Sequence, residues 1–162
     1  MRNNMGIYRG RRLDYKVWNV KWIKGGYLHQ TDYYGKKVDK HFILDGTDTG
    51  PDDVDIGEIY EVDPETVGEY TGLTDKKGTR IFEGDIVSIF VSRYKTPLLG
   101  EVKYGEYIHS KCDEYECNRY GFFVKVQWQN YCDNTGFEVS KETMQDMIVI
   151  GNIHDNPELL EV

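Results

Sequence analysis

The stretch Tyr70-Thr-Gly-Leu-Thr-Asp-Lys-Lys-Gly-Thr-Arg-Ile-Phe-Glu-Gly-Asp-Ile-Val87 decides the fold, because turn residues alternate regularly with short apolar runs. Asp75 to Gly78 has the composition of a tight turn in which Gly78 is free to take a positive φ, and Glu83-Gly84-Asp85 repeats this pattern. Arg80 to Phe82 is then a short strand. A second strand, Ile86 to Val91, is dense in β-branched and aromatic residues.

Working outward, period-2 alternation of apolar residues predicts further strands on both sides of this stretch. Toward the C-terminus, Tyr120 to Trp128 alternates most clearly, and Met147 to Ile150 is a short buried run. Toward the N-terminus, Tyr15 to Ile23 mixes aromatic and β-branched residues and ends at Gly25-Gly26, which we interpret as a hairpin turn. The predicted return strand is Tyr27 to Gln30, which is followed by another turn at Asp32 to Gly35 and a third strand at Lys37 to Leu44.

These runs predict a mainly β protein built from two small antiparallel lobes. We place the lobes at residues 1–57 and 58–162, because the loop that starts at Asp45 is rich in Gly, Asp and Pro. The second lobe is expected to curl like a barrel. Helix is expected only as short turns, one between Ser140 and Met147 and one starting at Pro157.

The turn residues of the central stretch and a second group near the C-terminus also carry a family resemblance. The eight positions that we interpret as its structural motif are Gly72, Asp75, Gly78, Glu83, Gly84, Asp85, Gly151 and Asn152. In this order they resemble the YopX family of small proteins from phages and prophages. The resemblance implies a phage or prophage accessory protein without an assigned activity, and so it supplies no catalytic residues. The segment from His109 to Asn118 departs from the family pattern and is interpreted as an insertion.

Composition places the chain among folded proteins and reveals an uneven charge. Of its 162 residues, 39% are hydrophobic and 14% aromatic, which argues against disorder. Residues 1–45 carry 10 Lys and Arg against 4 Asp and Glu, whereas residues 46–162 carry 10 against 24. The first segment is thus at +6 and the remainder at −14. Such a balance favours charge pairing within or between chains over a whole-surface nucleic-acid binder.

The N-terminus lacks a continuous apolar run, and no 18-residue apolar stretch occurs, so we expect a cytoplasmic protein without membrane contact. Three cysteines do not make a disulfide framework. Together with His109, the residues Cys112, Cys117 and Cys132 are the types that bind zinc, but their spacing does not match a structural zinc site. We therefore expect no metal and no cofactor.

The basic N-terminal segment supports a second interpretation, in which it binds single-stranded nucleic acid. Aromatic rings interleaved with cations are what such binding requires. The residues concerned are Arg9, Arg11, Arg12, Lys16, Trp18, Lys21 and Trp22. The competing and favoured interpretation is structural, since tryptophans in a small sheet usually fill the core and alternating lysines face solvent.

The sequence contains none of the common catalytic signatures. It has no G-x-S-x-G elbow, P-loop or G-x-G-x-x-G, and the histidines His29, His41 and His154 are scattered singly. Asp75, Glu83 and Asp85 stand beside glycines, which is typical of turn acids that cap backbone N–H groups. We therefore expect a non-enzymatic protein that acts through protein–protein interaction or self-assembly. Its contacts should include the basic N-terminal lobe against an acidic C-terminal lobe, and an unidentified host or phage protein is a further expected partner.

Overall fold

The computed structural model describes residues 6–13, 22–44, 58–90, 96–109, 118–126, 135–144 and 146–161. The chain forms two compact units, residues 1–70 and 71–162. The division falls within strand β5 (Gly68–Thr74) and so lies further along the chain than the boundary expected after residue 57. The reason is that the segment after this loop pairs with the first unit, where Val62 is a core residue.

The first unit is a sheet with the strand order β4-β3-β2-β1-β5. Its core consists of Ile23, Ile43 and Val62, which lie on one face of that sheet. Asp63 is the N-cap at the start of a short 3-10 turn, because the Asp63 carboxylate accepts a hydrogen bond from the Glu65 backbone. The elements are β1 (Tyr8–Arg11), β2 (Trp22–Tyr33), β3 (Lys36–Leu44), β4 (Ile59–Glu61), the 3-10 turn η1 (Pro64–Thr66) and the first part of β5.

The hairpin turn predicted at Gly25-Gly26 is wrong, because β2 runs through both glycines without a break. Gly25 pairs with Tyr8 of β1, while Gly26 pairs with Leu44 of β3. A Cβ on Gly25 would lie 1.8 Å from the Leu44 carbonyl oxygen. The glycine is therefore required for a close approach of two backbones and not for a turn. The turn predicted at Asp32 to Gly35 is confirmed, because the β2–β3 hairpin turns at Tyr34 and Gly35.

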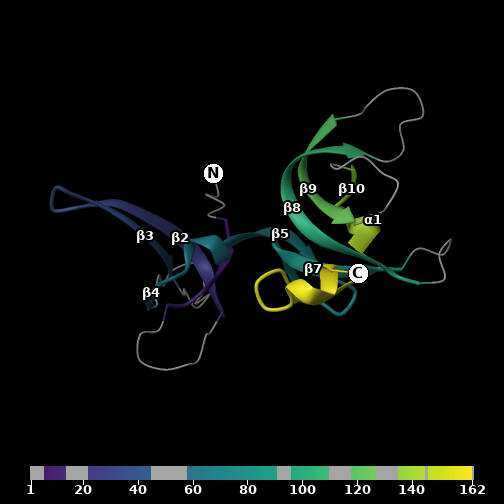
Figure 1. Cartoon of the computed structure of the whole chain (residues 1–162), viewed down its shortest axis with the longest axis horizontal. Coiled ribbons are helices and arrows are strands. Elements are labelled where there is room, and N and C mark those ends of the chain that lie inside the picture. The colour runs from purple at the N-terminus through teal and green to yellow at the C-terminus, as the bar shows by residue number, and fades with distance from the viewer. Residues whose placement is uncertain are drawn as a thin grey trace, which may run out of the picture. The chain divides into compact units, whose positions relative to one another are not determined.

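The second unit is a curled sheet with the strand order β10-β9-β8-β7-β11 (Figure 1). Neighbouring strands are antiparallel, and β10 makes an additional short parallel pairing with β8. Ile81, Val87, Val102, Val124 and Met147 are buried in its core. The rest of β5 lies beside β6. The strands are β6 (Arg80–Phe82), β7 (Asp85–Ile89), β8 (Leu98–His109), β9 (Asn118–Val126), β10 (Thr135–Glu138) and β11 (Met147–Asn152).

These observations confirm a mainly β fold with two antiparallel sheets and only short helical pieces. The helical pieces of the second unit are α1 (Lys141–Met144) and the 3-10 turn η2 (Pro157–Leu160), which starts at the predicted residue. No pairing between β10 and β11 closes the second sheet within the described residues, so its barrel-like form stays a prediction. In the same part of the chain, none of the helices has the length and apolar character needed to cross a membrane.

Candidate functional site on the β2–β3 arm

Asp75, the first acid of the predicted motif, is buried at the centre of a turn. It is 4% exposed, and its Oδ1 accepts hydrogen bonds of 2.8 Å from the backbone N–H groups of Lys77 and Thr79. Its Oδ2 accepts a third, of 3.0 Å, from Val149 of β11. Burial acts to raise the pKa of Asp75, but these hydrogen bonds outweigh it and hold the pKa below its ordinary value. The carboxylate thus joins a turn to a strand 74 residues away.

The second half of the motif is organised in the same way. Asp85 is fully buried, and its Oδ2 accepts a hydrogen bond of 2.8 Å from the Phe82 backbone. Gly84, between them, has a φ of 78°, and Gly78 and Gly72 also lie in the left-handed region. Near the C-terminus, Asn152 Oδ1 accepts hydrogen bonds from the His154 and Asp155 backbones. These polar side chains stabilise turns by accepting hydrogen bonds from backbone N–H groups.

The structure brings three of the residues proposed for nucleic-acid binding together on one sheet face. Arg9 and Arg11 lie on β1, and their guanidinium carbons are 4.8 and 5.4 Å from the centroid of the Trp22 ring on β2. Arg12 lies 4.5 Å from the Tyr60 ring instead. The face of Trp22 that the arginines cover is therefore not available to a base.

The other residues named for nucleic-acid or metal binding lie largely outside the described part of the chain. This holds for Lys16, Trp18 and Lys21, for all three cysteines, and for the side chain of His109.

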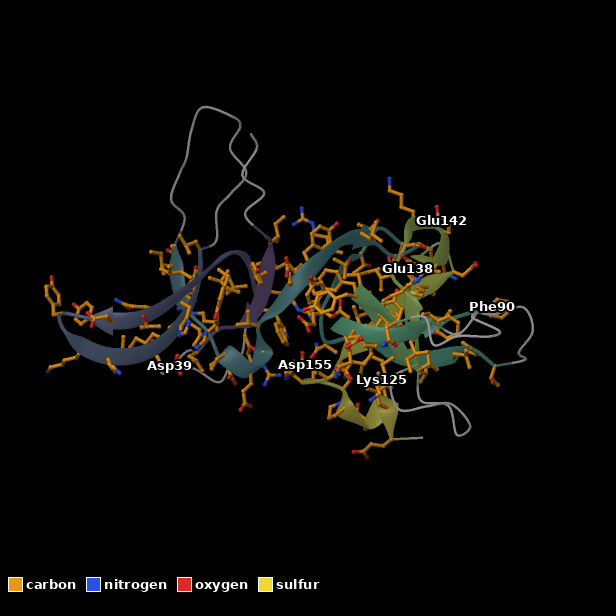
Figure 2. The ribbon with its side chains drawn as sticks, turned by 90° about the horizontal axis from the view of Figure 1, so that it is seen from above. Asp39, Phe90, Lys125, Glu138, Glu142 and Asp155 are labelled. Atoms are coloured by element: carbon orange, nitrogen blue, oxygen red, sulfur yellow. The ribbon has the colours of Figure 1, made fainter. Side chains whose placement is uncertain are left out.

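A different feature of the first unit stands out in the structure. Beyond Gly25, β2 pairs only with β3 within the described residues, and β3 pairs with β4 only from Phe42 onward. Residues 28–41 therefore form a two-stranded hairpin, here called the arm (Figure 1). Within the described residues its two edges are open except at His41, whose carbonyl oxygen accepts a hydrogen bond from the Val62 backbone. Figure 2 shows the Asp39 side chain on this hairpin. Most of its residues from Leu28 to Lys40 are exposed.

Two tyrosines form the tip of the arm. Tyr34 is 90% exposed and has a φ of 50°, and Gly35 follows at 74°. Tyr33 packs edge-on against Tyr34, with 4.7 Å between the ring centroids. Asp32 supports the turn, because its Oδ1 accepts a hydrogen bond from the Gly35 backbone. The loop has two residues, both with positive φ, which is the type I′ hairpin geometry.

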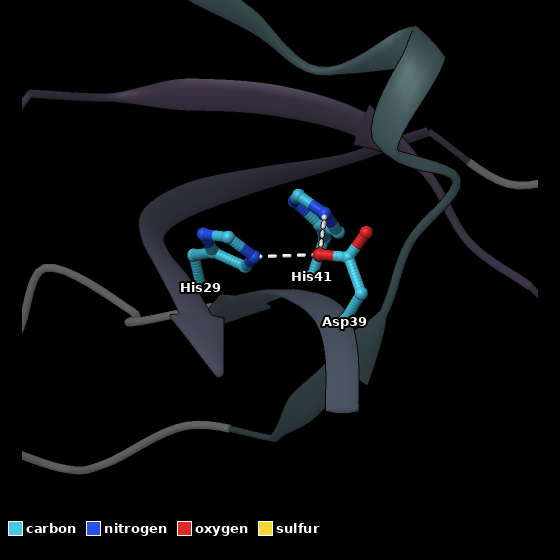
Figure 3. A group of neighbouring side chains, drawn as sticks. All are labelled: His29, Asp39 and His41. Atoms are coloured by element: carbon cyan, nitrogen blue, oxygen red, sulfur yellow. Dashed lines mark hydrogen bonds and ion pairs between the residues drawn. The ribbon is translucent and has the colours of Figure 1, made fainter. Parts of the chain in front are cut away.

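Further along the same hairpin, two histidines and an aspartate meet on one face (Figure 3). His29 of β2 and His41 of β3 are directly opposed in the strand register, and their rings stack with centroids 4.3 Å apart. Asp39 Oδ1 lies 2.7 Å from His29 Nε2 and 3.2 Å from His41 Nε2. The hydrogen bond from His29, followed by that from His41, lowers the pKa of Asp39.

Tyr27 supports this cluster from the core side. Its hydroxyl hydrogen-bonds the other ring nitrogen of His41, Nδ1. Burial, together with the charge of Asp39, raises the pKa of Tyr27 above its ordinary value, so the phenol stays protonated at neutral pH. The cluster therefore consists of an exposed carboxylate, two imidazoles and a neutral phenol behind one of them.

Sequence reasoning missed this cluster because it treated His29 and His41 as scattered. The predicted turn at Asp32 to Gly35 already separates the two histidines, and their equal distance from Gly35 along the chain is the signal that could have revealed the pair. Asp39 lies two residues before His41 on β3, so strand alternation already places both side chains on one face. Between the pairs Gln30–Lys40 and Asp32–Lys37, one residue of β2 faces two residues of β3, and this bulge includes Asp39.

Comparison with known proteins identifies the family of the chain. The family model described as YopX protein matches residues 14–161. A solved structure that is similar to the chain is the crystal structure of protein EF1440 from Enterococcus faecalis, at 23% identity and a TM-score of 0.47, with 96% of this chain and 97% of that one covered. Curated proteins gave no significant match. Because the family match spans nearly the whole sequence, this chain belongs to the YopX protein family.

Proposed function

We propose that the protein is a non-enzymatic interaction protein, and that it contacts its partner through the tyrosine tip of the arm. The observation that carries this proposal is the conformation of Tyr34, which combines 90% exposure with a left-handed backbone. Such a backbone is unfavourable for a bulky side chain, and the first position of a type I′ turn favours Asn, Asp or Gly. The chain therefore keeps a costly residue at a place where that residue makes little contact with its own fold.

Tyrosine is a residue type that protein interfaces use heavily. Its ring contributes a large contact area with few rotatable bonds, and its hydroxyl still forms a hydrogen bond when the ring is covered. At the tip, Tyr33 is also exposed and fixes Tyr34 through the edge-on ring contact. A partner would thus meet a pre-ordered aromatic pair, which lowers the entropy cost of binding.

The first partner that we propose is a second copy of the chain. The charge of +6 on residues 1–45 and of −14 on the remainder makes two copies complementary. Edge-to-edge pairing of arms through β3 is less favoured than contact through the tip. Strand β3 contains Lys36, Lys37 and Lys40, and lysines on an edge strand oppose pairing with another strand. Exposed charges alone contribute little at physiological salt, so burial of the tyrosine rings supplies most of the affinity.

The hydrogen bonds of the buried motif acids support the non-enzymatic part of the proposal. Asp75 and Asp85 direct their carboxylate oxygens at backbone N–H groups of turns and of a neighbouring strand. An acid that is committed to such hydrogen bonds is poorly placed to exchange protons with a substrate.

Sedimentation velocity of the purified protein tests the proposal. We expect an oligomer at micromolar concentration that persists at 0.5 M salt, roughly five times the ionic strength at which the Debye length is about 10 Å. Tyr34→Asn should shift it toward the monomer while the fold remains, because Asn suits the turn. A wild-type protein that sediments as a monomer under these conditions contradicts self-association.

The chain offers a matched control in the second unit. Tyr120 is 73% exposed and contacts Tyr104 edge-on, with 5.3 Å between the ring centroids, so it resembles Tyr34 in exposure and in ring pairing. Tyr120→Thr removes an exposed tyrosine from a strand and should leave association unchanged. Loss of association in both variants would show that exposed tyrosines act non-specifically. A gel shift with single-stranded DNA, abolished by Arg11→Ala, would favour the nucleic-acid alternative instead.

A further inference from the structure

We infer that His29, Asp39 and His41 form a binding site for a divalent transition-metal ion of the Zn²⁺ type. The ligand atoms are His29 Nε2, His41 Nε2 and Asp39 Oδ1. This inference is independent of the partner of the tyrosine tip. It also differs from the expectation that the chain binds no metal, because that expectation considered the cysteines and His109 and overlooked these residues.

The three ligand atoms already lie close enough to share one ion. All lie within 4.8 Å of one another, and Asp39 Oδ1 is 2.7 and 3.2 Å from the two imidazole nitrogens. Zinc binds such atoms at about 2.0–2.2 Å in a tetrahedron, which places ligand atoms about 3.3 Å apart. The two separations from Asp39 are slightly below this value, and the stacked imidazole rings must tilt toward each other before both Nε2 atoms face one ion.

The backbone holds the three residues in place without help from a ligand. His29 and His41 are a directly opposed cross-strand pair, whose side chains necessarily share a face of the hairpin. Asp39 lies two residues before His41 on β3 and therefore shares the same face (Figure 3). Because the ligands come from paired strands, little conformational entropy remains to be lost when an ion binds.

The hydrogen bonds of the cluster fit the needs of a metal site. Metal binding at Nε2 of a neutral imidazole leaves the proton on Nδ1, which then requires an acceptor. For His41 this acceptor is the hydroxyl oxygen of Tyr27, which already contacts Nδ1 and belongs to a neutral phenol. The ion replaces the two hydrogen bonds to Asp39 and keeps its carboxylate as a charged ligand.

The ligand set and its exposure point to the class of ion. Two imidazoles and one carboxylate suit Zn²⁺ and its first-row neighbours, whereas Ca²⁺ and Mg²⁺ prefer oxygen ligands. The Asp39 side chain is 79% exposed, so an ion can reach the site from solvent. Three protein ligands leave a coordination position for water.

A zinc titration of the full-length protein, followed through the imidazole nitrogens by long-range ¹H–¹⁵N NMR, tests the inference. We expect His29 and His41 to change to the Nε2-bound form at one equivalent of zinc, while His154 does not shift. His29→Gln and Asp39→Asn should each weaken zinc binding at least tenfold. Both side chains are on the exposed arm, so both variants should fold, which an unchanged thermal melt would verify.

Two control variants make the result decisive. His154→Gln removes a histidine outside the cluster and should leave the affinity unchanged. A protein with Cys112→Ser, Cys117→Ser and Cys132→Ser should also keep it. The inference is overturned if zinc leaves both arm histidines unshifted, if the cysteine replacements abolish binding, or if the Kd exceeds about 1 mM, the weak end of the affinity scale.

Discussion

The arm and the motif around Asp75 and Asp85 both gather polar side chains, yet they do so in opposite settings. Asp75 and Asp85 are at most 4% exposed, and their oxygens accept hydrogen bonds from backbone N–H groups. Asp39 is exposed, and both of its recorded contacts are to histidine side chains. A carboxylate bound to backbone cannot leave without removing the acceptor of several backbone N–H groups at once. A carboxylate bound to exposed side chains can exchange them for a ligand.

This difference separates a polar cluster that stabilises the fold from one that is available for binding. Substitutions in the first cluster should lower the stability and disturb the whole unit. Substitutions on the arm should alter binding and leave the stability nearly unchanged, because an exposed ion pair contributes little to folding.

Asp75→Ala should have the largest effect, a loss of about 3–5 kcal/mol in the free energy of unfolding. The substitution removes three hydrogen-bonded contacts at once and leaves the N–H groups of Lys77, Thr79 and Val149 without their acceptor. Urea denaturation of the variant beside the parent measures the loss. If the free energy of unfolding of the variant lies within about 1 kcal/mol of that of the parent, water replaces the carboxylate as hydrogen-bond acceptor and Asp75 is not essential for stability.

Acid should destabilise the protein partly through the same residue. The pKa of Asp75 is lower in the folded chain than its ordinary value of about 3.9, so its charged form favours folding. This contribution to stability is fully present when the pH lies above the ordinary pKa. It is lost as the pH falls from the ordinary pKa through the lowered pKa of the folded chain. Thermal melts between pH 7 and pH 3 should therefore show a smaller acid-induced decrease of Tm in Asp75→Asn. Equal decreases in both proteins would contradict this assignment.

Gly84→Ala should cost about 1 kcal/mol or more, because its φ of 78° is unfavourable for a residue with a Cβ. The space around it is not the cause, since the nearest atom to an added Cβ, Ile153 Cγ1, would be 3.6 Å away. Gly26→Ala is a matched control, because it also has open space around the added Cβ but no positive φ. Equal effects in the two variants would count against the backbone explanation.

Tyr34→Asn should have the smallest effect and the opposite sign, a gain of a few tenths of a kcal/mol, about the relief expected at a left-handed turn position. The gain arises because Asn tolerates the left-handed conformation better than a bulky ring does. Differential scanning calorimetry detects it as a slightly higher Tm. A clear decrease of Tm would show that Tyr34 stabilises the fold, which would remove the argument for a binding role.

Much of the fold could be predicted from sequence because its signals are local. Arg80 to Phe82 is a strand between two glycine turns, and both Gly78 and Gly84 have the predicted positive φ. Pro157 starts the last helical turn, as its fixed φ requires, although the side chain of Asn156 does not cap it. In each of these places, a residue with a strong conformational preference decides its own surroundings.

The remaining features depend on pairing between distant residues and therefore could not be predicted. The pair Gly25-Gly26 has the composition of a turn. The close approach of the Leu44 carbonyl to Gly25 becomes apparent only when β2 and β3 are placed in register. The cluster of His29, Asp39 and His41 likewise depends on the register that places His29 opposite His41. The turn wrongly predicted at Gly25-Gly26 divided β2, whereas the predicted turn at Asp32 to Gly35 left the exact register of the two histidines open.

The measurement that tests the central claim most directly is the removal of the arm. Replacing residues 30–40 by an Asn-Gly turn deletes the tyrosine tip and Asp39 but keeps the core residues Ile23 and Ile43. We predict that this protein unfolds at nearly the same temperature as the parent, does not self-associate in sedimentation velocity, and binds zinc at least tenfold more weakly, because His29 and His41 remain but Asp39 is removed. A shortened protein that still associates as the parent does, or that fails to fold, would contradict the account of the arm as a binding element.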